Sequence, residues 1–472
     1  MKIDTKCIQS GYEPENGQPR VLPIYQSTTY KYDSSEFLGE LFDLKAEGHM
    51  YSRISNPTVA CVEAKIADLE GGIGAMCTTS GQAANMMAIL NISETGDNFV
   101  CLSTIYGGTV NLFAVSLKKL GVEVRFVDAN MTDEEIDAKF DDKTRAVFGE
   151  TLANPAMDVL DIERFAKIAH KHNVPLIIDN TFATPVLCRP FEFGADIVTH
   201  STTKYMDGHA TVVGGVIVDS GKFDWEAAGK FDCLCTPDES YHGVVYTKDF
   251  GKAAYITKAR VQLMRDIGAM PTAMSAFLLN LGLETLHLRM RKHSDNALAV
   301  AKFLETNDKI EWVKYPALDS AKDKALAQKY LPNGCCGVVS FGVKGGRDKA
   351  MKLMDSLKLA KIVVHVADAR TCVLHPASTT HRQLTDEQLV ACGIGPELVR
   401  MSIGIEDVED IIEDMGYDGR HSYEDNIMPV EEAYRRWGGH IAILGGLDMD
   451  FLVRSTPQAI GARARAMLDM AR

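Results

Sequence analysis

The 472-residue sequence lacks an excess of positive charge and long apolar runs, and each absence excludes a class of protein. Its formal net charge is −14, which argues against a protein that binds nucleic acids or anionic membranes. No apolar run approaches the roughly 18 residues that a membrane-spanning helix needs. The first residues, "MKIDTKCIQSGYEPENG", contain no apolar segment typical of a signal peptide. We therefore expect no nucleic-acid partner and no membrane partner.

Paired cysteine motifs are also missing. The eleven cysteines are odd in number and lie mostly inside apolar runs, which is typical of reduced, buried thiols in a cytoplasmic protein. Two close pairs, Cys233/Cys235 and Cys335/Cys336, lack the two-residue gap and the second matching pair of a zinc site. The sequence therefore predicts a cytoplasmic protein with no metal site.

Strands and helices alternate through the first half of the chain. Apolar strands are predicted at 99–102, 122–127, 146–150, 174–180 and 196–199. Helices are predicted at 58–69, which ends at Gly71-Gly72, and at 161–171. This alternation indicates an α/β fold with a mostly parallel sheet covered on both faces, whose functional residues gather at the carboxyl ends of the strands.

Changes in pattern divide the chain into four parts. Residues 1–57 are expected to form an extended arm, and 58–255 a large α/β domain. Long helices at 256–267 and 272–306 open a smaller α+β domain that ends near residue 415. Residues 416–472 form an additional tail.

Four features follow the predicted strands, and each has an ordinary alternative. Gly81 precedes a helix and could cradle a phosphate, or belong to a simple cap. Tyr106, beside two glycines, could stack on a planar ligand, or only pack. Asp179 follows a buried strand, where a carboxylate needs a cation or a hydrogen-bond donor from a ligand, or it could simply cap a helix. Lys204 could be a nucleophile of lowered pKa, or a surface lysine.

Together these features match the requirements of one cofactor. A phosphate cradle, a stacking ring, an acid for a pyridinium nitrogen and an imine-forming lysine are what pyridoxal phosphate (PLP) requires. The hydroxyls of Ser201 and Thr203, just before Lys204, then become additional donors to the phosphate. The sequence therefore predicts a PLP site at the carboxyl edge of the sheet.

From about residue 4 to 415 the chain resembles the Cys/Met-metabolism family of PLP enzymes. The matching motifs, in order, are "YSRISNPT" (51–58), "SGQAA" (80–84), "YGGT" (106–109), "FGETLANP" (148–155), "IDNTFATP" (178–185), "HSTTK" (200–204) and "VRMSIGIED" (399–407). Seven ordered motifs over some 400 residues make the resemblance specific. It implies the aspartate-aminotransferase-like fold of PLP-dependent transferases (fold type I), with a mostly parallel central sheet and a smaller C-terminal α+β domain.

The resemblance also implies site residues. Lys204 would form the Schiff base with the cofactor, Asp179 would hold the pyridinium nitrogen, and Tyr106 would stack on the ring and assist at the γ-carbon. The residues implied to hold the phosphate are Gly81, Gln82, Ser201 and Thr203. Asn154 would lie beside the phenolic oxygen, and Arg400 would bind the substrate carboxylate. Tyr51 and Arg53 would reach a neighbouring subunit's phosphate, which implies at least a homodimer. The family is usually tetrameric, so the resemblance implies a homotetramer built of dimers that share active sites.

Within the family the chain most resembles the O-acetylhomoserine sulfhydrylases, through "LFDLKAEGHMYSRISNPT", "TPDESYHGVVYTKDFG" and "LHPASTTHRQL". Their reaction is γ-replacement: O-acetyl-L-homoserine and sulfide give L-homocysteine and acetate, in methionine and cysteine biosynthesis. A methionine or cystathionine γ-lyase, a cystathionine γ-synthase and a non-catalytic binding protein are the alternatives. Methionine γ-lyases carry Cys where this chain has Gly108, which favours the sulfhydrylase. Intact Lys204 and Asp179 argue against the non-catalytic protein.

Two segments depart from the family pattern. In "HVADARTCVLHP" (365–376), His365 replaces a small polar residue and Ala367 replaces Gly. We expect His365 to be a loop histidine with its hydrogen bonds satisfied rather than a new acid or base. The tail resembles a C-terminal fragment of uroporphyrinogen decarboxylase, with a helix at 429–437, a strand at 440–445 and a capped helix after Ser455-Thr456-Pro457. One βα unit is too small for a core of its own, so we expect no decarboxylase activity.

Overall fold

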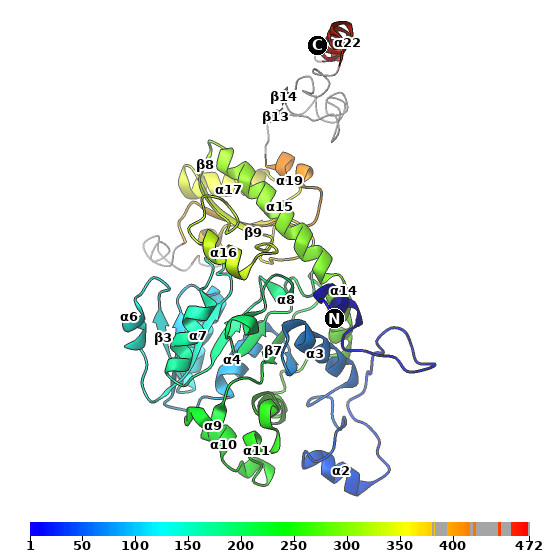
Figure 1. Cartoon of the computed structure of the whole chain (residues 1–472), viewed down its shortest axis with the longest axis vertical. Coiled ribbons are helices and arrows are strands. Elements are labelled where there is room, and N and C mark those ends of the chain that lie inside the picture. The colour runs from blue at the N-terminus through cyan, green and yellow to red at the C-terminus, as the bar shows by residue number, and fades with distance from the viewer. Residues whose placement is uncertain (380–381, 383–393, 416–418, 422–441, 445–454, 471–472) are drawn as a thin grey trace.

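The computed structural model describes residues 1–379, 382, 394–415, 419–421, 442–444 and 455–470. Two β-sheets follow one another along the longest axis of the molecule, and the long helix α15 (Leu286–Thr306) runs beside the second sheet (Figure 1). Within the described residues, no helix is long and apolar enough to cross a membrane.

The first sheet has seven strands in the order β1-β7-β6-β5-β4-β2-β3. Their bounds are Gly74–Thr78 (β1), Asn98–Leu102 (β2), Glu123–Val127 (β3), Thr144–Glu150 (β4), Leu176–Asp179 (β5), Ile197–His200 (β6) and Gly215–Asp219 (β7). Of these, only β7 runs antiparallel to its neighbours. The five predicted strands are therefore confirmed, and β1 and β7 are additional to them.

Helices cover the faces of this sheet. They include α3 (Pro57–Glu70), α4 (Gly81–Leu90) and α7 (Ile162–Lys171). The helix α3 begins at Asn56, whose side chain accepts hydrogen bonds from two backbone N–H groups, and ends at Gly71 in the left-handed conformation. Both predicted helices, at 58–69 and 161–171, are thus confirmed.

An aromatic cluster joins the sheet to the helices above it. Phe113, in a π-helical segment (Leu112–Leu117), meets Phe99 of β2 and Phe148 of β4 edge-on, with ring centroids 4.9 and 5.0 Å apart. All three rings are fully buried. Such edge-to-face pairs add stabilisation to that given by the burial of apolar area. They therefore help to hold β2 and β4 in place under the π-helical segment.

The prediction of an extended arm at 1–57 is wrong in part, because the arm contains two helices. They are α1 (Ile3–Gln9) and α2 (Ser35–Phe42). Each buries a single side chain, Cys7 in α1 and Leu41 in α2. Both helices are short, of seven and eight residues, and α2 has apolar residues at helical spacing, Phe37, Leu38, Leu41 and Phe42, a signal that was overlooked.

The second sheet has five strands in the order β10-β11-β12-β9-β8. Their bounds are Ile310–Lys314 (β8), Val338–Val343 (β9), Lys361–Ile362 (β10), Cys372–Leu374 (β11) and Leu398–Ser402 (β12). The helices α16 (Lys324–Tyr330), α17 (Gly346–Ser356) and α19 (Val408–Asp414) accompany it. The domain boundaries expected near residues 57, 255 and 415 stay a prediction.

The helix predicted at 272–306 is two helices, α14 (Ala273–Glu284) and α15, which meet at Thr285. At the break, the buried Arg289 guanidinium donates to the carbonyl of Gly282, 2.6 Å away. The helix predicted at 256–267 is continuous, but its middle, Ala259–Met264, is π-helical.

In the tail, β13 (Gly419–His421) pairs in parallel with β14 (Ala442–Leu444), which confirms the strand predicted at 440–445. The helix α22 (Pro457–Met470) follows, and Thr456 accepts a hydrogen bond from the N–H of Ala459, 3.3 Å away, as the predicted cap. The helix predicted at 429–437 lies outside the described residues. β13, β14 and α22 project beyond the second sheet (Figure 1).

Candidate functional site

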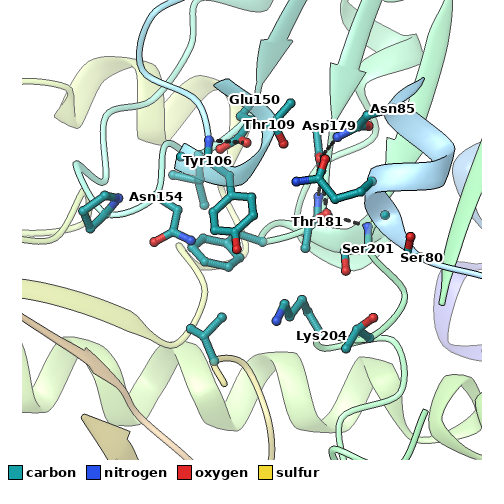
Figure 2. Close-up of a pocket in the computed structure, with 18 of the residues that line it drawn as sticks. Ser80, Asn85, Tyr106, Thr109, Glu150, Asn154, Asp179, Thr181, Ser201 and Lys204 are labelled. Carbon is teal, nitrogen blue, oxygen red and sulfur yellow. Dashed lines mark hydrogen bonds between the residues drawn. The ribbon is translucent and has the colours of Figure 1, made fainter. Parts of the chain in front are cut away.

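A pocket of about 260 Å³ opens where β4, β5 and β6 end and α4 begins. Nine of the eleven predicted site residues line it: Gly81, Gln82, Tyr106, Asn154, Asp179, Ser201, Thr203, Lys204 and Arg400. In Figure 2 the phenol of Tyr106 and the amine of Lys204 point into the same space from opposite sides. The prediction that these residues meet at the carboxyl edge of the sheet is therefore confirmed as geometry.

Lys204 lies in the turn after β6 and is partly buried. Burial, and then the nearby guanidinium of Arg400, lower the pKa of its amine to about 8. A lysine with this pKa is partly unprotonated near neutral pH and can act as a nucleophile or base. The interpretation as an ordinary surface lysine is therefore wrong.

Asp179 is the last residue of β5 and is almost completely buried. Its carboxylate accepts hydrogen bonds from Asn85 Nδ2 (3.1 Å), from the N–H of Thr181 (3.1 Å) and from the Thr181 hydroxyl (2.5 Å). The helix α8 (Thr184–Leu187) begins only after Ala183, so Asp179 is not a helix cap. Three donors therefore hold this carboxylate in a fixed position at the wall of the pocket.

Thr181 also connects neighbouring strands. Its hydroxyl oxygen accepts a hydrogen bond from the backbone N–H of Ser201, 2.8 Å away, while its hydroxyl donates to Asp179. The ends of β5 and β6 are therefore joined by one side chain, which fixes the position of the Ser201–Lys204 turn relative to Asp179.

The start of α4 forms a cradle for an anion. Ser80 caps the helix by accepting from the N–H of Ala83 at 3.1 Å, and the other N–H groups of a first turn have no intrahelical partner. A Cβ at Gly81 would lie 2.6 Å from Cβ of Ser201, so only glycine permits this approach. Within the described part of the chain, the buried Oε1 of Gln82 has no hydrogen-bond partner.

Tyr106 stands at the rim of the pocket, with 47% of its surface exposed. Its backbone N–H donates to Glu150 Oε1, 2.8 Å away, and its ring lies against Gly108. A Cβ at Gly108 would lie 2.5 Å from Cε1 of Tyr106 and 2.7 Å from Nε2 of Gln82. Glycine at 108 therefore permits this position of the ring.

Arg400, in β12, brings the second sheet into the pocket. Its guanidinium donates to Asn154 Oδ1 at 3.3 Å and to the carbonyl of Val364 at 3.4 Å, both long contacts. Among the described residues its buried Nε has no partner. A guanidinium with such long contacts has N–H groups available to bind a carboxylate.

His365 is not a satisfied loop histidine, and that expectation is wrong. Its carbonyl accepts from Cys372 Sγ at 3.4 Å and from Arg400 Nη2 at 3.5 Å, whereas its buried Nε2 has no partner among the described residues. Burial, and then the charge of Lys204, lower the pKa of the imidazole. The ring is therefore held mostly neutral near the pocket.

Tyr51 and Arg53 do not line this pocket. Tyr51 is exposed, the guanidinium of Arg53 lies 5.3 Å from the centre of the Tyr51 ring, and Arg53 donates to the carbonyl of Arg265. Their predicted role toward a neighbouring subunit stays a prediction.

Sequence reasoning missed several polar residues of the site, notably Asn85, Glu150 and Thr181. Glu150 had the same signal as Asp179, because it is a carboxylate at the end of a buried strand. Asn85 and Thr181 carried no signal of their own, since their roles depend on which strands and helices are neighbours.

Comparison with known proteins agrees with this geometry. Residues 4–417 match the family model of the Cys/Met metabolism PLP-dependent enzymes. The homocysteine synthase of Schizosaccharomyces pombe is 46% identical over 415 residues, which are 87% of this chain and 96% of that protein. The O-acetyl-L-homoserine sulfhydrylase of Leptospira meyeri is 44% identical over 425 residues, 88% of this chain and 96% of that one.

A solved structure is also similar. The crystal structure of a Campylobacter jejuni protein named as an O-acetylhomoserine (thiol)-lyase has a TM-score of 0.84 and 35% identity, and the match covers 88% of this chain and 99% of that one. That structure contains N′-pyridoxyl-lysine-5′-monophosphate. The similarity confirms the expected PLP-dependent α/β fold.

Proposed function

The chain belongs to the Cys/Met metabolism PLP-dependent enzymes, and we propose that it is an O-acetylhomoserine sulfhydrylase, which converts O-acetyl-L-homoserine and sulfide to L-homocysteine and acetate. The names of its relatives support this substrate. The observation that carries the proposal is a lysine of lowered pKa, Lys204, in one pocket with Asp179, Tyr106 and Arg400.

The residues of the pocket fit the cofactor of the family. The N–H groups at Gly81 and Gln82 and the hydroxyl of Ser201 would hold the phosphate at the positive end of the α4 dipole. Thr203 lines the same pocket, although its hydroxyl already exchanges hydrogen bonds with Gly214. Asp179 would hold the pyridine nitrogen, and Asn154 would lie beside the phenolic oxygen.

When bound, PLP supplies an electron sink that stabilises negative charge at the substrate α-carbon. The protein supplies the proton transfers. The Lys204 amine, neutral in part near pH 8, would take the α-proton and assist removal of a β-proton as a general base. The C–O bond at the γ-carbon breaks with departure of acetate, and the C–S bond to sulfide forms in its place.

Arg400 and Tyr106 would orient the substrate. The guanidinium would exchange its long contacts to Asn154 and Val364 for a bidentate pair with the α-carboxylate. The half-exposed phenol would stack on the cofactor and donate or accept a proton near the γ-carbon, where the acetate leaves.

We infer that the active enzyme is a homo-oligomer, a homotetramer built of two dimers. Tyr51 and Arg53, exposed in the arm and outside the pocket, would complete the phosphate site of a neighbouring subunit. We also infer a cytoplasmic location, because the ten cysteines of the described residues carry free thiols.

The strongest alternative is a γ-lyase. Against it stands Gly108, because a larger side chain there would collide with the Tyr106 ring in its present position. Cystathionine γ-synthase differs only in using cysteine in place of sulfide.

Product analysis of the PLP-loaded protein tests the proposal. We expect homocysteine and acetate from O-acetyl-L-homoserine and sulfide, with O-succinylhomoserine turned over more slowly. Release of 2-oxobutyrate from methionine or cystathionine as the faster reaction would assign the γ-lyase, and cystathionine formed faster than homocysteine would assign the synthase.

A further inference from the structure

Glu150 is a second carboxyl group in the wall of the pocket, beside Asp179. It ends β4 as Asp179 ends β5, and the two residues are paired in the register of these parallel strands. Only 9% of Glu150 is exposed. One of its oxygens, Oε1, accepts a hydrogen bond of 2.8 Å from the backbone N–H of Tyr106.

This bond holds the backbone of Tyr106, whose ring stands at the rim of the pocket. Tyr106 lies between β2 and α5 (Gly107–Asn111), and its carbonyl accepts from the N–H groups of Thr109 and Val110 at 2.8 and 3.0 Å. The Glu150 carboxyl thus holds the N–H side of the peptide chain at Tyr106, while α5 holds the carbonyl side. The ring itself is half exposed, so packing alone fixes it weakly.

We propose that Glu150 is a positioning residue, which holds the Tyr106 ring in the place where it stacks on the cofactor. The proposal rests on the cofactor site described above and extends it to a residue that touches the loop rather than the cofactor. The backbone N–H of Asn154 also stabilises this carboxyl, so one side chain anchors the loops on both sides of the cofactor.

The two carboxyl groups have different hydrogen-bond partners. Asp179 accepts from the side chains of Asn85 and Thr181 and from the N–H of Thr181, whereas Glu150 accepts from backbone N–H groups. Burial, and then the charge of Asp179, raise the pKa of Glu150 well above its usual value. These surroundings favour the neutral form of Glu150, which a glutamine matches in charge while it keeps an acceptor oxygen.

The test uses two substitutions of similar size. Glu150→Met fills the space without an acceptor oxygen, whereas Glu150→Gln keeps the acceptor. Two quantities are measured: the dissociation constant of PLP for the apoprotein, and the circular dichroism of the bound cofactor, which reports the asymmetry of its surroundings. We expect Glu150→Met to weaken PLP binding about tenfold, as for one hydrogen bond lost to a buried N–H, and to reduce the dichroic band. Glu150→Gln should retain both properties.

A double-mutant cycle separates positioning from a general structural role. In a Tyr106→Ala background, the effect of Glu150→Met on PLP binding should be smaller, because the ring that Glu150 positions is gone and only its bond to the N–H of Asn154 is still lost. An unchanged effect in that background, or a loss with Glu150→Gln as large as with Glu150→Met, would overturn the proposal.

Asp219→Asn is the matched control. Asp219 is also a buried carboxyl at a strand end, and burial raises its pKa to about 7, but it lies at the opposite edge of the sheet, paired with Gly74. Its substitution should leave the PLP dissociation constant and the dichroic band unchanged. Failure of the proposed function is recognised separately, as a wild-type protein that binds PLP but forms no homocysteine.

Discussion

Arg400, in the second sheet, lies close enough to act on the charge of Lys204, in the turn that follows β6 of the first sheet. Together with burial, which is the larger cause, the guanidinium lowers the pKa of the lysine amine to about 8. The protonated amine is therefore destabilised, and the neutral, nucleophilic form is present at a pH about two units lower than in an exposed lysine.

The first prediction concerns the pH dependence of cofactor attachment. Because only the neutral amine is nucleophilic, the rate at which apoprotein attaches PLP should rise with pH, with a midpoint near 8. In Arg400→Met one neighbouring positive charge is lost, so the midpoint should move to higher pH. Stopped-flow absorbance of the cofactor measures the rate of attachment in the wild type and in Arg400→Met. An unchanged midpoint in Arg400→Met would show that the guanidinium charge does not lower the pKa of Lys204.

Lys204→Ala is the control for that experiment. It should abolish turnover, and mass spectrometry after borohydride reduction should find no cofactor covalently attached. A fully active Lys204→Ala protein would contradict the assignment of the lysine itself.

A second prediction concerns Arg400→Lys, which keeps the charge but removes the planar pair of donors. We expect kcat/KM for O-acetyl-L-homoserine to fall by about ten- to a hundredfold, the equivalent of one or two hydrogen bonds to a charged group. Most of the loss should be in KM, because the carboxylate is bound throughout the reaction. Steady-state kinetics at saturating PLP checks this, and a loss confined to kcat would argue for a different role.

Gly108→Cys gives a third prediction. A Cβ at this position would come within 2.5 Å of the Tyr106 ring and 2.7 Å of Gln82 Nε2, so both side chains must move. We expect the homocysteine-forming activity to fall and PLP binding to weaken. Gly17→Cys serves as the comparison, since no atom lies within 4 Å of a Cβ there, although positive φ makes that position strained as well. Equal activity of Gly108→Cys and wild type would show that the ring tolerates displacement.

The fourth prediction concerns the tail. The family match ends at residue 417, and none of the residues that line the pocket comes from β13, β14 or α22. Deletion of residues 418–472 should therefore leave kcat and KM unchanged. We expect neither the full chain nor the truncated chain to have decarboxylase activity. A truncated protein with lower kcat would give the tail a part in the enzyme.

Much of the large sheet could be predicted, because its strands are short runs of buried apolar residues. The positions of β2, β4 and β6 follow from such runs, and their predicted ends differ from the observed ones by no more than two residues. The antiparallel direction of β7 and the strand order of the second sheet could not be predicted, since pairing between distant strands leaves no local pattern. The same limit applies to the break at Thr285, a position that no Gly or Pro marks in the sequence.

The site was predictable to the extent that its residues follow strands or match motifs. Asp179 and Lys204 were found in this way, and Glu150 could have been. The Thr181 hydroxyl could not, because its importance arises only when β5 and β6 lie side by side and it joins Asp179 to Ser201. His365 shows the opposite error: an ordinary loop residue was expected, and the structure leaves its Nε2 unpaired within the described residues.

The way in which Ser80 caps α4 has a practical consequence for handling the apoprotein. Its side chain uses the N–H of Ala83, so the groups left for an anion are the main-chain N–H groups of Gly81 and Gln82 and the Ser201 hydroxyl. None of these groups is charged, and they discriminate little among phosphates. Inorganic phosphate in a buffer should therefore compete with the cofactor when PLP is added to the apoprotein. In a buffer without anions of this kind, the time needed for reconstitution should be shorter.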